Sequence, residues 1–249
     1  MIDIHCHILP RLDDGASTME EALEMARMAA DSGVTDIVAT PHFPGTEESL
    51  AERRRITARW QALSDAIEQA EIPLKLHPGA EILCTPETPH LAARGLLPSI
   101  NGTRYLLTEF PFDTPFAQMD ALLRGIADAG YVPVVAHPER YDAIHQEPFR
   151  VERWFRREYV LQMNKGSILG AFGSRVGHTA DLLLDAGLVH LIASDAHSAH
   201  RRTPHMGPLK EWLRHNLDPD YARILLEANP RRLLKDQPMV PVDQTSPTR

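Results

Sequence analysis

The sequence is poor in cysteine and contains no long apolar run. Only two of its 249 residues are cysteines, Cys6 and Cys84, so no disulfide framework is implied and a reducing cytoplasm is the expected compartment. Nowhere do about eighteen apolar residues follow one another, and no basic segment precedes an apolar stretch at the start. We therefore expect neither export nor direct insertion into a membrane.

Positive charge is also scarce. Against 34 Asp and Glu the chain has 26 Lys and Arg, which gives a formal net charge of −8. Proteins that bind nucleic acid or anionic membranes need a sustained basic surface, so the sequence predicts no nucleic-acid partner. Histidine is abundant instead: the chain has 13, more than solubility or one general base requires.

Short β-rich runs alternate with helical stretches, a pattern typical of a parallel sheet or barrel. With 249 residues and 43% hydrophobic content, the chain can form a single domain with a large core. We place that domain at residues 1–235, because residues 236–249 are polar and proline-containing and predict a loosely ordered tail. The main predicted helices start near Met19, Ile56, Phe116, Phe149, Val176, Pro208 and Pro219. The seven predicted strands are Met1–His5, Thr35–Thr40, Leu74–His77, Arg104–Glu109, Val132–Ala136, Tyr159–Asn164 and Val189–Ala193.

The chain opens with MIDIHCHILPRLDDG, in which an apolar strand breaks into two histidines and, after a loop, two aspartates. Successive side chains of a strand point to opposite faces, so His5 and His7 share a face while Cys6 packs on the other. A pair of this kind has the geometry of two metal ligands. Alone, the motif fits two solvated histidines at a frayed terminus equally well.

Potential metal ligands follow six of the seven predicted strands. In a parallel barrel the loops after the strands converge on one face, so residues far apart in sequence meet there. Each residue alone could be a core histidine, a salt-bridge partner or a helix N-cap, but nine at one topological position indicate a metal site. They are the histidines His5, His7, His42, His137 and His197 and the carboxylates Asp14, Glu81, Glu109 and Asp195.

Nine ligands exceed the coordination number of one ion, whereas two or three divalent ions bridged by carboxylates would use them all. Nitrogen and oxygen ligands without thiolate favour Mn, Fe or Zn over Mg or Ca. Three such ions, four carboxylates and a bridging hydroxide leave a charge of about +1, which suits an anionic substrate. Arg140 in HPER and Arg202 in HRRTPHMG follow ligands closely, and guanidinium groups match phosphate oxygens, whereas Arg201 is expected to be a surface charge.

Taken together, the motifs HCH…DDG, ATPH, GAE, TEFP, HPERY and SDAH resemble the polymerase-and-histidinol-phosphatase (PHP) superfamily. The N-terminal stretch, HPERY and RTPHMG are similar, more narrowly, to the bacterial metal-dependent protein-tyrosine phosphatases of capsule and exopolysaccharide operons, from Met1 to about Leu234. The resemblance implies an α/β fold, a distorted seven-stranded TIM-like (β/α) barrel, with a trinuclear site, manganese as the usual ion, the nine residues above as ligands, and Arg140 and Arg202 as phosphate binders. The chain departs from the family at Arg11, where glycine is more frequent; Arg11 adds a phosphate or peptide contact or is a solvated loop residue.

The implied activity is hydrolysis of phosphotyrosine on the tail of a bacterial tyrosine kinase that controls polysaccharide export. A metal-bridging hydroxide would attack phosphorus in line, with no covalent enzyme intermediate, while Arg140 and Arg202 stabilise the equatorial oxygens. Because a phenolate leaves with a pKa of about 10, protonation matters less than for an alkyl ester. If a general acid is needed, Asp195 or a neighbouring histidine is the candidate.

Three other functions share part of this pattern. A small-molecule phosphatase, such as one acting on histidinol phosphate, would have the same metals and different loops. An amidohydrolase also begins with His-x-His on a barrel strand, but it distributes its ligands differently and has no use for the two arginines. A barrel that only docks on a kinase tail and regulates it has no need of nine intact ligands.

Overall fold

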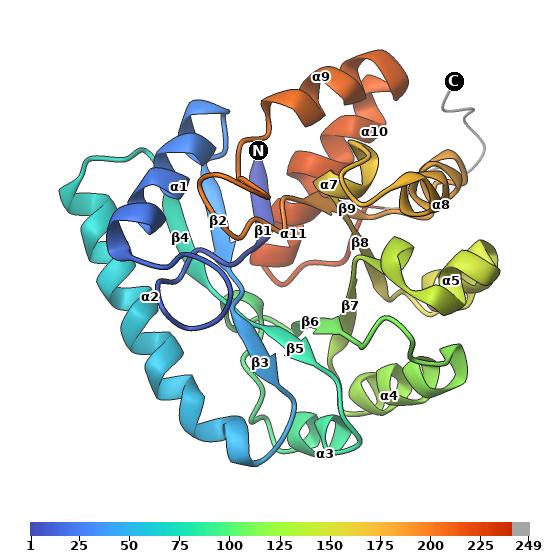
Figure 1. The fold of residues 1–249 in the computed structure, drawn as a ribbon. Helices are drawn as coiled ribbons and strands as arrows, with labels where there is room; N and C mark the ends of the chain where they lie inside the picture. Colours follow the sequence, from blue (N-terminus) through green and yellow to red (C-terminus); the bar gives the residue numbers. More distant parts are fainter. Residues whose placement is uncertain (241–249) are drawn as a thin grey trace.

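Helices surround a central group of short strands (Figure 1). The computed structural model describes residues 1–240. The strands are β1 (Ile2–Cys6), β2 (Asp36–Ala39), β3 (His42–Pro44), β4 (Lys75–Pro78), β5 (Glu81–Leu83), β6 (Tyr105–Glu109), β7 (Val132–Ala136), β8 (Val160–Asn164) and β9 (Leu191–Ala193). The α-helices are α1 (Met19–Asp31), α2 (Glu52–Gln69), α3 (Thr88–Ala93), α4 (Phe116–Asp128), α5 (Asp142–Gln146), α6 (Glu152–Phe155), α7 (Lys165–Ile168), α8 (Ser174–Asp185), α9 (Gly207–Asn216), α10 (Pro219–Arg223) and α11 (Asn229–Leu234). Shorter helical turns are η1 (Glu48–Ala51), η2 (Ile100–Gly102), η3 (Pro138–Arg140), η4 (Pro148–Val151) and η5 (Ile224–Ala228).

The strands form two parallel sheets that do not close, so the expected distorted seven-stranded barrel is not confirmed by the strand pairing. One sheet has the order β1-β2-β4 and the other β3-β5-β6-β7-β8-β9. All seven predicted strand positions contain a strand, but β3 and β5 are additional. β1 and the end of β9 are joined by an isolated bridge just beyond β9, where the amide of Asp195 donates to His5 O and the amide of His7 donates to Ala196 O. The fold is therefore mixed α/β with parallel sheets.

Two residues mark the gaps before the additional strands β3 and β5. Pro41 lies between β2 and β3 and has no N–H to donate to a ladder. Gly79 lies between β4 and β5 where a Cβ would come within 2.8 Å of Val38 Cγ1, so the buried Val38 side chain occupies the space that a side chain at position 79 would need. Each break restarts the chain on a new strand, and the first residues of these strands, His42 and Glu81, are partners in register.

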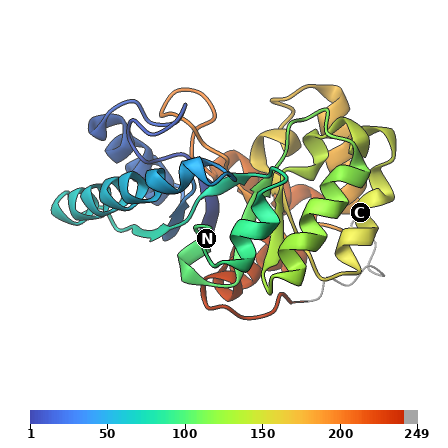
Figure 2. The same ribbon diagram turned by 90° about the horizontal axis from the view of Figure 1, so that it is seen from below.

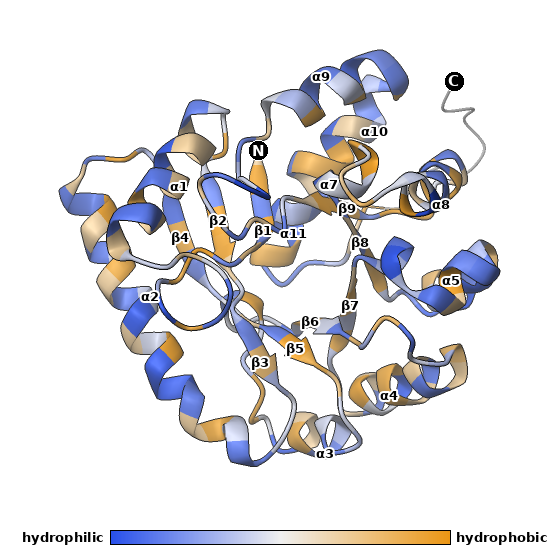
Figure 3. Ribbon diagram, in the orientation of Figure 1, coloured by the Kyte–Doolittle hydropathy of each residue, from blue (hydrophilic) through white to orange (hydrophobic). Residues whose placement is uncertain are grey.

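Both faces of the strands are buried. On β7, Val134 and Ala136 belong to a small apolar cluster built mainly from strand residues, whereas Val135 belongs to the larger cluster beneath the helices. This alternation is expected of strands packed on both faces, and the helices turn their polar sides outward (Figure 3). Cys6 and Cys84 are buried free thiols, and Cys6 packs in the larger cluster as predicted. No helix among the described residues is long and apolar enough to cross a bilayer.

Two of the predicted helices are shorter or less regular in the structure than expected. The expected helix at 149–158 is a turn, η4, followed by the four-residue α6, and the one at 219–228 continues from α10 into a π turn. α1 begins at Met19 as predicted, with Thr18 accepting from the amide of Glu21. Glu21 closes the cap by accepting hydrogen bonds from the amide and hydroxyl of Ser17.

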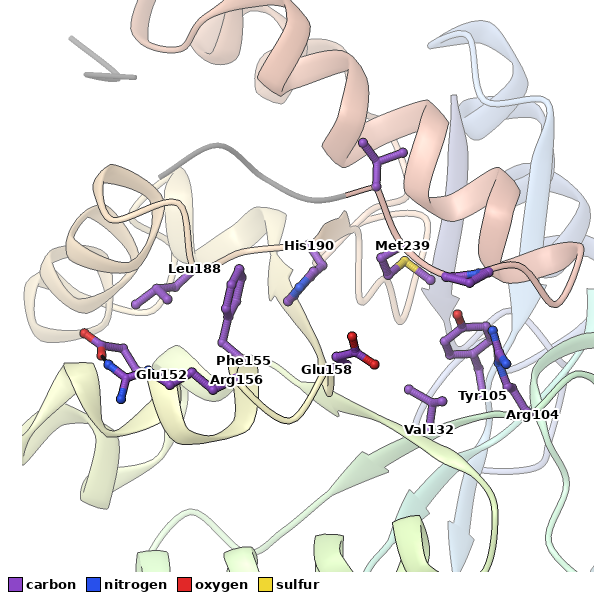
Figure 4. Close-up of a pocket in the computed structure, with 12 residues that line it drawn as sticks. Arg104, Tyr105, Val132, Glu152, Phe155, Arg156, Glu158, Leu188, His190 and Met239 are labelled. Carbon is purple, nitrogen blue, oxygen red and sulfur yellow. Dashed lines mark hydrogen bonds and ion pairs between the residues drawn. The ribbon is translucent and has the colours of Figure 1, made fainter. Parts of the chain in front are cut away.

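The amino ends of the strands enclose a cavity of about 590 Å³ that lies away from the predicted ligands. Tyr105, Phe155 and His190 line it together with Met239 (Figure 4). The expected loose tail starts at residue 236, yet residues 236–240 are held here: the hydroxyl of Tyr105 donates to Gln237 O, and the amide of Val240 donates to Asn229. Residues 241–249 of the expected tail lie outside the described residues.

The buried His190 imidazole makes stability depend on pH. Its Nδ1 accepts a hydrogen bond from the amide of Leu161 at 3.1 Å, and burial lowers the pKa of His190 to about 4. The unfolded imidazole has an ordinary pKa near 6.5, so below that pH the unfolded chain gains the proton first and the free energy of unfolding decreases until about pH 4. One pKa unit is worth about 1.36 kcal/mol, so the contribution is on the order of 3 kcal/mol.

Urea unfolding of metal-free wild type and of His190→Gln between pH 7.5 and 4 checks this prediction. We expect the stability difference between the two proteins to change steadily across the window from about 6.5 to 4, with wild type losing more. Parallel curves for the two proteins would contradict it.

Candidate metal centre

The predicted ligands meet at the carboxyl ends of the strands. The loops that follow β1 (blue) and β9 (orange) lie along the same edge of the molecule in Figure 2. These loops bring together residues almost two hundred positions apart, as the topology of parallel strands predicts. Nine residues gather here: His5, His7, Asp14, His42, Glu81, Glu109, His137, Asp195 and His197.

Glu81 lies in the middle of this cluster. Its Oε2 is 3.3 Å from His5 Nε2, 3.2 Å from His7 Nε2 and 3.2 Å from His42 Nδ1. Its Oε1 is 3.1 Å from His137 Nε2. One buried carboxylate thus contacts four imidazoles, a density of nitrogen and oxygen ligands that ordinary packing does not require.

Three overlapping groups of the cluster have ligand atoms within 4.8 Å of one another, close enough to hold a metal ion. One is buried, and the other two share His42 at the open side, where its side chain is 38% exposed. The groups are His5, His7 and Glu81; His42, Glu81 and Glu109; and His7, Asp14, His42 and His197.

A bulge in β1 helps to aim the first histidine pair. Asp3 pairs with Ile37 and Cys6 with Ala39, so Ile4 and His5 together lie opposite Val38. The extra residue lets Ile4 stay in the strand core while His5 contacts the cluster. His5 and His7 share a side as predicted, with their Nε2 atoms 3.2 Å apart.

A chain of buried amides orients His5, and sequence reasoning missed it. The amide nitrogen of Asn164 donates to the carboxylate of Asp195, so Asn164 Oδ1 is left to accept from Gln162 Nε2 at 2.9 Å. Gln162 Oε1 therefore lies 2.9 Å from His5 Nδ1 and accepts its proton. His5 then presents the lone pair of Nε2 to the cluster, as a metal ligand must.

The lone pairs that the clustered side chains present show whether metal ions fit the site. His7 Nδ1 lies 2.7 Å from Asp13 Oδ2, so its Nε2 also presents a lone pair. The Nε2 atoms of His5 and His7 and the Oε2 of Glu81 are then three acceptors within about 3.3 Å of one another, with no donor between them. Such a set is stable only around positive charge, and its composition of imidazole and carboxylate suits Mn, Fe or Zn. The residues present therefore fit divalent metal ions.

The pKa values of His7 and His42 report the same demand for positive charge, whereas His197 resists protonation. Burial opposes charging His7, but the hydrogen bond to Asp13 and the nearby Glu81 outweigh it and raise the pKa of His7 to about 9. Burial opposes charging His42 as well, yet Glu109 and Glu81 raise its pKa to about 11. Burial and the neighbouring His7 lower the pKa of His197 to about 4. Without metal ions, the carboxylates thus favour the protonated forms of His7 and His42, whose positive charge balances the negative charge of the carboxylates.

Asp195 joins the cluster to the two predicted arginines. Its Oδ1 lies 3.5 Å from His5 Nε2, while its Oδ2 accepts from Arg202 and lies 3.5 Å from Arg140 Nη1. Burial opposes its ionisation, but His5, His137 and Arg202 hold the pKa of this carboxyl well below its usual range. Both guanidinium groups therefore lie at the edge of the histidine cluster, as predicted.

Lys165 fastens the loop that carries Arg202. The buried Lys165 ammonium donates to the carbonyls of Thr203 and His205, and the amide of His197 donates to Arg202 O at 2.9 Å. Nothing in the sequence around Lys165 indicates this role. Asp13, by contrast, had a signal in the DDG motif, but only Asp14 was selected from that pair.

Three site residues adopt left-handed backbone conformations that favour glycine: φ is 35° at His137 and 49° at both Asp195 and Arg202. Such conformations cost on the order of 1 kcal/mol each for residues with a Cβ and are retained where function requires them. Arg11 has φ of 60°, which explains why glycine suits this position. Its Nε donates to Ser17 O within the same exposed loop.

Comparisons with known proteins agree with this chemistry. A family model described as "Capsular polysaccharide synthesis, CpsB/CapC" matches residues 1–235. Tyrosine-protein phosphatase YwqE of Bacillus subtilis (strain 168) is 35% identical over 239 residues, 95% of this chain and 92% of that protein. Tyrosine-protein phosphatase CpsB of Streptococcus pneumoniae is 30% identical over 247 residues, 95% of this chain and 99% of that protein.

Solved structures show the same similarity. A chain from the crystal structures of YwqE from Bacillus subtilis and CpsB from Streptococcus pneumoniae, described as unique metal-dependent tyrosine phosphatases, superposes with a TM-score of 0.87. It is 32% identical, and the match covers 100% of both chains. A phosphotriesterase homology protein from Escherichia coli, 14% identical with a TM-score of 0.58, shares the fold alone.

The amide chain on β8 predicts an effect on metal affinity. Replacing Gln162 with Leu removes the acceptor that fixes His5, and loss of such an orienting partner typically weakens metal binding about 10- to 100-fold. Calorimetric titration of metal-stripped protein with Mn²⁺ measures this. His77→Gln is the control, because His77 is a buried histidine paired with Asp36 outside the cluster. Equal affinities in Gln162→Leu and wild type would contradict the prediction.

Proposed function

The chain belongs to the CpsB/CapC family of capsular polysaccharide synthesis, and we propose that it is a metal-dependent tyrosine-protein phosphatase, a phosphoric monoester hydrolase. The observation that carries this function is the cluster around Glu81 with two arginines beside it. The cluster supplies ligands for divalent ions, and the arginines supply donors for a phosphate.

We assign all nine clustered residues as ligands of two or three divalent ions, with Mn as the expected ion and Fe or Zn as alternatives. The three overlapping ligand groups support this number, because His7, His42 and Glu81 each belong to two of them. We also propose that the strands form a distorted barrel of the PHP type, in which β2–β3 and β4–β5 are interrupted single strands. Residues 1–235, the extent of the family match, would be the catalytic unit.

When bound, the ions lower the pKa of water in the site toward neutrality and offset phosphate charge. Arg140 and Arg202 bind the non-bridging phosphate oxygens, for which their planar N–H groups are suited. Asp195 holds both guanidinium groups at the edge of the cluster before substrate arrives. Because Asp195 is ionised and already accepts hydrogen bonds from Asn164 and Arg202, we assign it to anchoring rather than to proton donation.

The leaving group explains why no strong acid is required. A tyrosine phenolate has a pKa of about 10, so it departs without full protonation. We propose as substrate a phosphotyrosine segment of a protein, specifically the tail of a bacterial tyrosine kinase that controls capsule or exopolysaccharide synthesis, and the cytoplasm as the place of action. The family's description and the names of its members support this choice.

Release of inorganic phosphate tests the reaction and its substrate class. We expect metal-stripped protein to be inactive and added Mn²⁺ to restore hydrolysis of a phosphotyrosine peptide, because the acceptor-rich cluster needs cations. Histidinol phosphate is the comparison substrate, and the peptide should be preferred. Preference for histidinol phosphate would move the protein to the small-molecule phosphatases, and no release from either substrate would overturn the phosphatase assignment.

The adjacent arginines provide a matched pair. Arg202 contacts Asp195 at the cluster, whereas Arg201 is exposed on the same loop. Removing a donor that stabilises developing charge typically costs about 10²- to 10³-fold in kcat. We therefore expect Arg202→Ala to lose roughly that factor on the phosphotyrosine peptide, and Arg201→Ala to stay within about twofold of wild type. Equal losses in both variants would mean that net charge, not phosphate contact, matters.

A further inference from the structure

The Arg140 guanidinium lies between two phenyl rings. Its Cζ is 4.5 Å from the centroid of Phe112 and 4.4 Å from that of Phe172. Phe112 comes from the loop after β6 and Phe172 from the connection between α7 and α8. Arg202 Cζ is 5.7 Å from the same Phe172 ring. Two aromatic side chains therefore border the place where the phosphate is expected.

Phe112 is exposed, unlike most large apolar side chains of this protein. It is 45% exposed, and among the described residues only Phe149 and Leu169 are comparable. A contact with one guanidinium does not account for this exposure, because a buried ring could make the same contact. The remaining surface of Phe112 is therefore accessible to a ligand beside the cluster.

Both rings are held in place by the surrounding structure. A Cβ at Gly166 would lie 2.7 Å from Phe172 Cε2, so this ring rests directly on the glycine backbone of α7. The backbone of Phe112 is anchored by its carbonyl, which accepts from the amide of Asp142 at 2.9 Å, and its ring lies 6.0 Å from that of His137 and 6.1 Å from that of Tyr141. Fixed rings lose little conformational freedom when a ligand stacks on them.

We propose that Phe112 and Phe172 contact the aryl group of the substrate and set a preference for aryl over alkyl phosphate monoesters. The inference rests on the proposed phosphatase function. With phosphate at Arg140 and Arg202, an aryl ring follows phosphorus by a single oxygen and so must lie beside these arginines, where the two phenyl rings are. Aromatic pairs gain from stacking or edge-to-face contact, which an alkyl ester cannot provide.

Two phosphonates separate ring recognition from phosphate recognition. Phenylphosphonate and methylphosphonate carry the same anionic group, are not hydrolysed, and differ in the ring. Calorimetric titration of Mn²⁺-loaded protein gives both affinities. We expect wild type to prefer phenylphosphonate, and Phe112→Leu and Phe172→Leu to lose roughly 3- to 10-fold for it while changing less than about twofold for methylphosphonate.

Matched variants complete the test. Phe149 is 49% exposed but is not among the aromatic contacts of Arg140, so Phe149→Leu should bind both phosphonates as wild type does. Phe112→Tyr keeps a ring and should keep the preference. Equal loss for both phosphonates would show that the rings only position Arg140, and no loss for either would show that they do not contact the ligand. Both results overturn the inference.

The phosphate-release assay keeps this inference separate from the proposed function. A wild-type protein that hydrolyses the phosphotyrosine peptide, with unchanged phosphonate preference in Phe112→Leu and Phe172→Leu, refutes only the role of the rings. A wild-type protein that releases no phosphate from the peptide refutes the function on which the inference rests.

Discussion

Glu81 is a buried carboxylate with four imidazoles about 3 Å away, and its charge must be balanced by cations because water cannot reach it. That requirement constrains everything near it. The strand must restart at Glu81 so that its side chain enters the cluster beside His42, its partner in register. Gly79 leaves room for the Val38 side chain just before this restart, and Pro41 lies between β2 and β3 on the neighbouring strand.

The part of the site that could be predicted is the part set by topology and charge. Candidate ligands such as His5, His137 and Asp195 are conspicuous at the ends of apolar strands, and parallel strands bring their carboxyl ends together whatever the loops do. The strand positions themselves followed from the alternation of apolar runs with helical stretches. What the sequence did not reveal is that further strands, β3 and β5, follow Pro41 and Gly79, and that the strand pairing divides into two sheets.

The part that could not be predicted depends on distances rather than residue types. β8 ends without a ligand, and glutamine and asparagine on a buried strand carry no distinctive signal. Gln162 and Asn164 matter only because the ionised carboxylate of Asp195 accepts hydrogen bonds and cannot donate them. This carboxylate orients the amide of Asn164, which orients the amide of Gln162. The oxygen of Gln162 then determines which ring nitrogen of His5 is protonated. The left-handed backbone conformation at Asp195 could not be predicted either, because most aspartates have a negative φ and nothing in the sequence marks this one.

The arrangement around Arg140 separates the two things a guanidinium can do. Phe112 and Phe172 occupy its faces, while its edge points to Asp195 Oδ2. Cation–π contacts use the faces and leave the N–H groups free, whereas a carboxylate or a phosphate uses the edge. An entering phosphate therefore competes with Asp195 for the edge and leaves the aromatic contacts intact. The carboxylate keeps the arginine charge balanced until an anion arrives, and the aromatic contacts persist through that exchange.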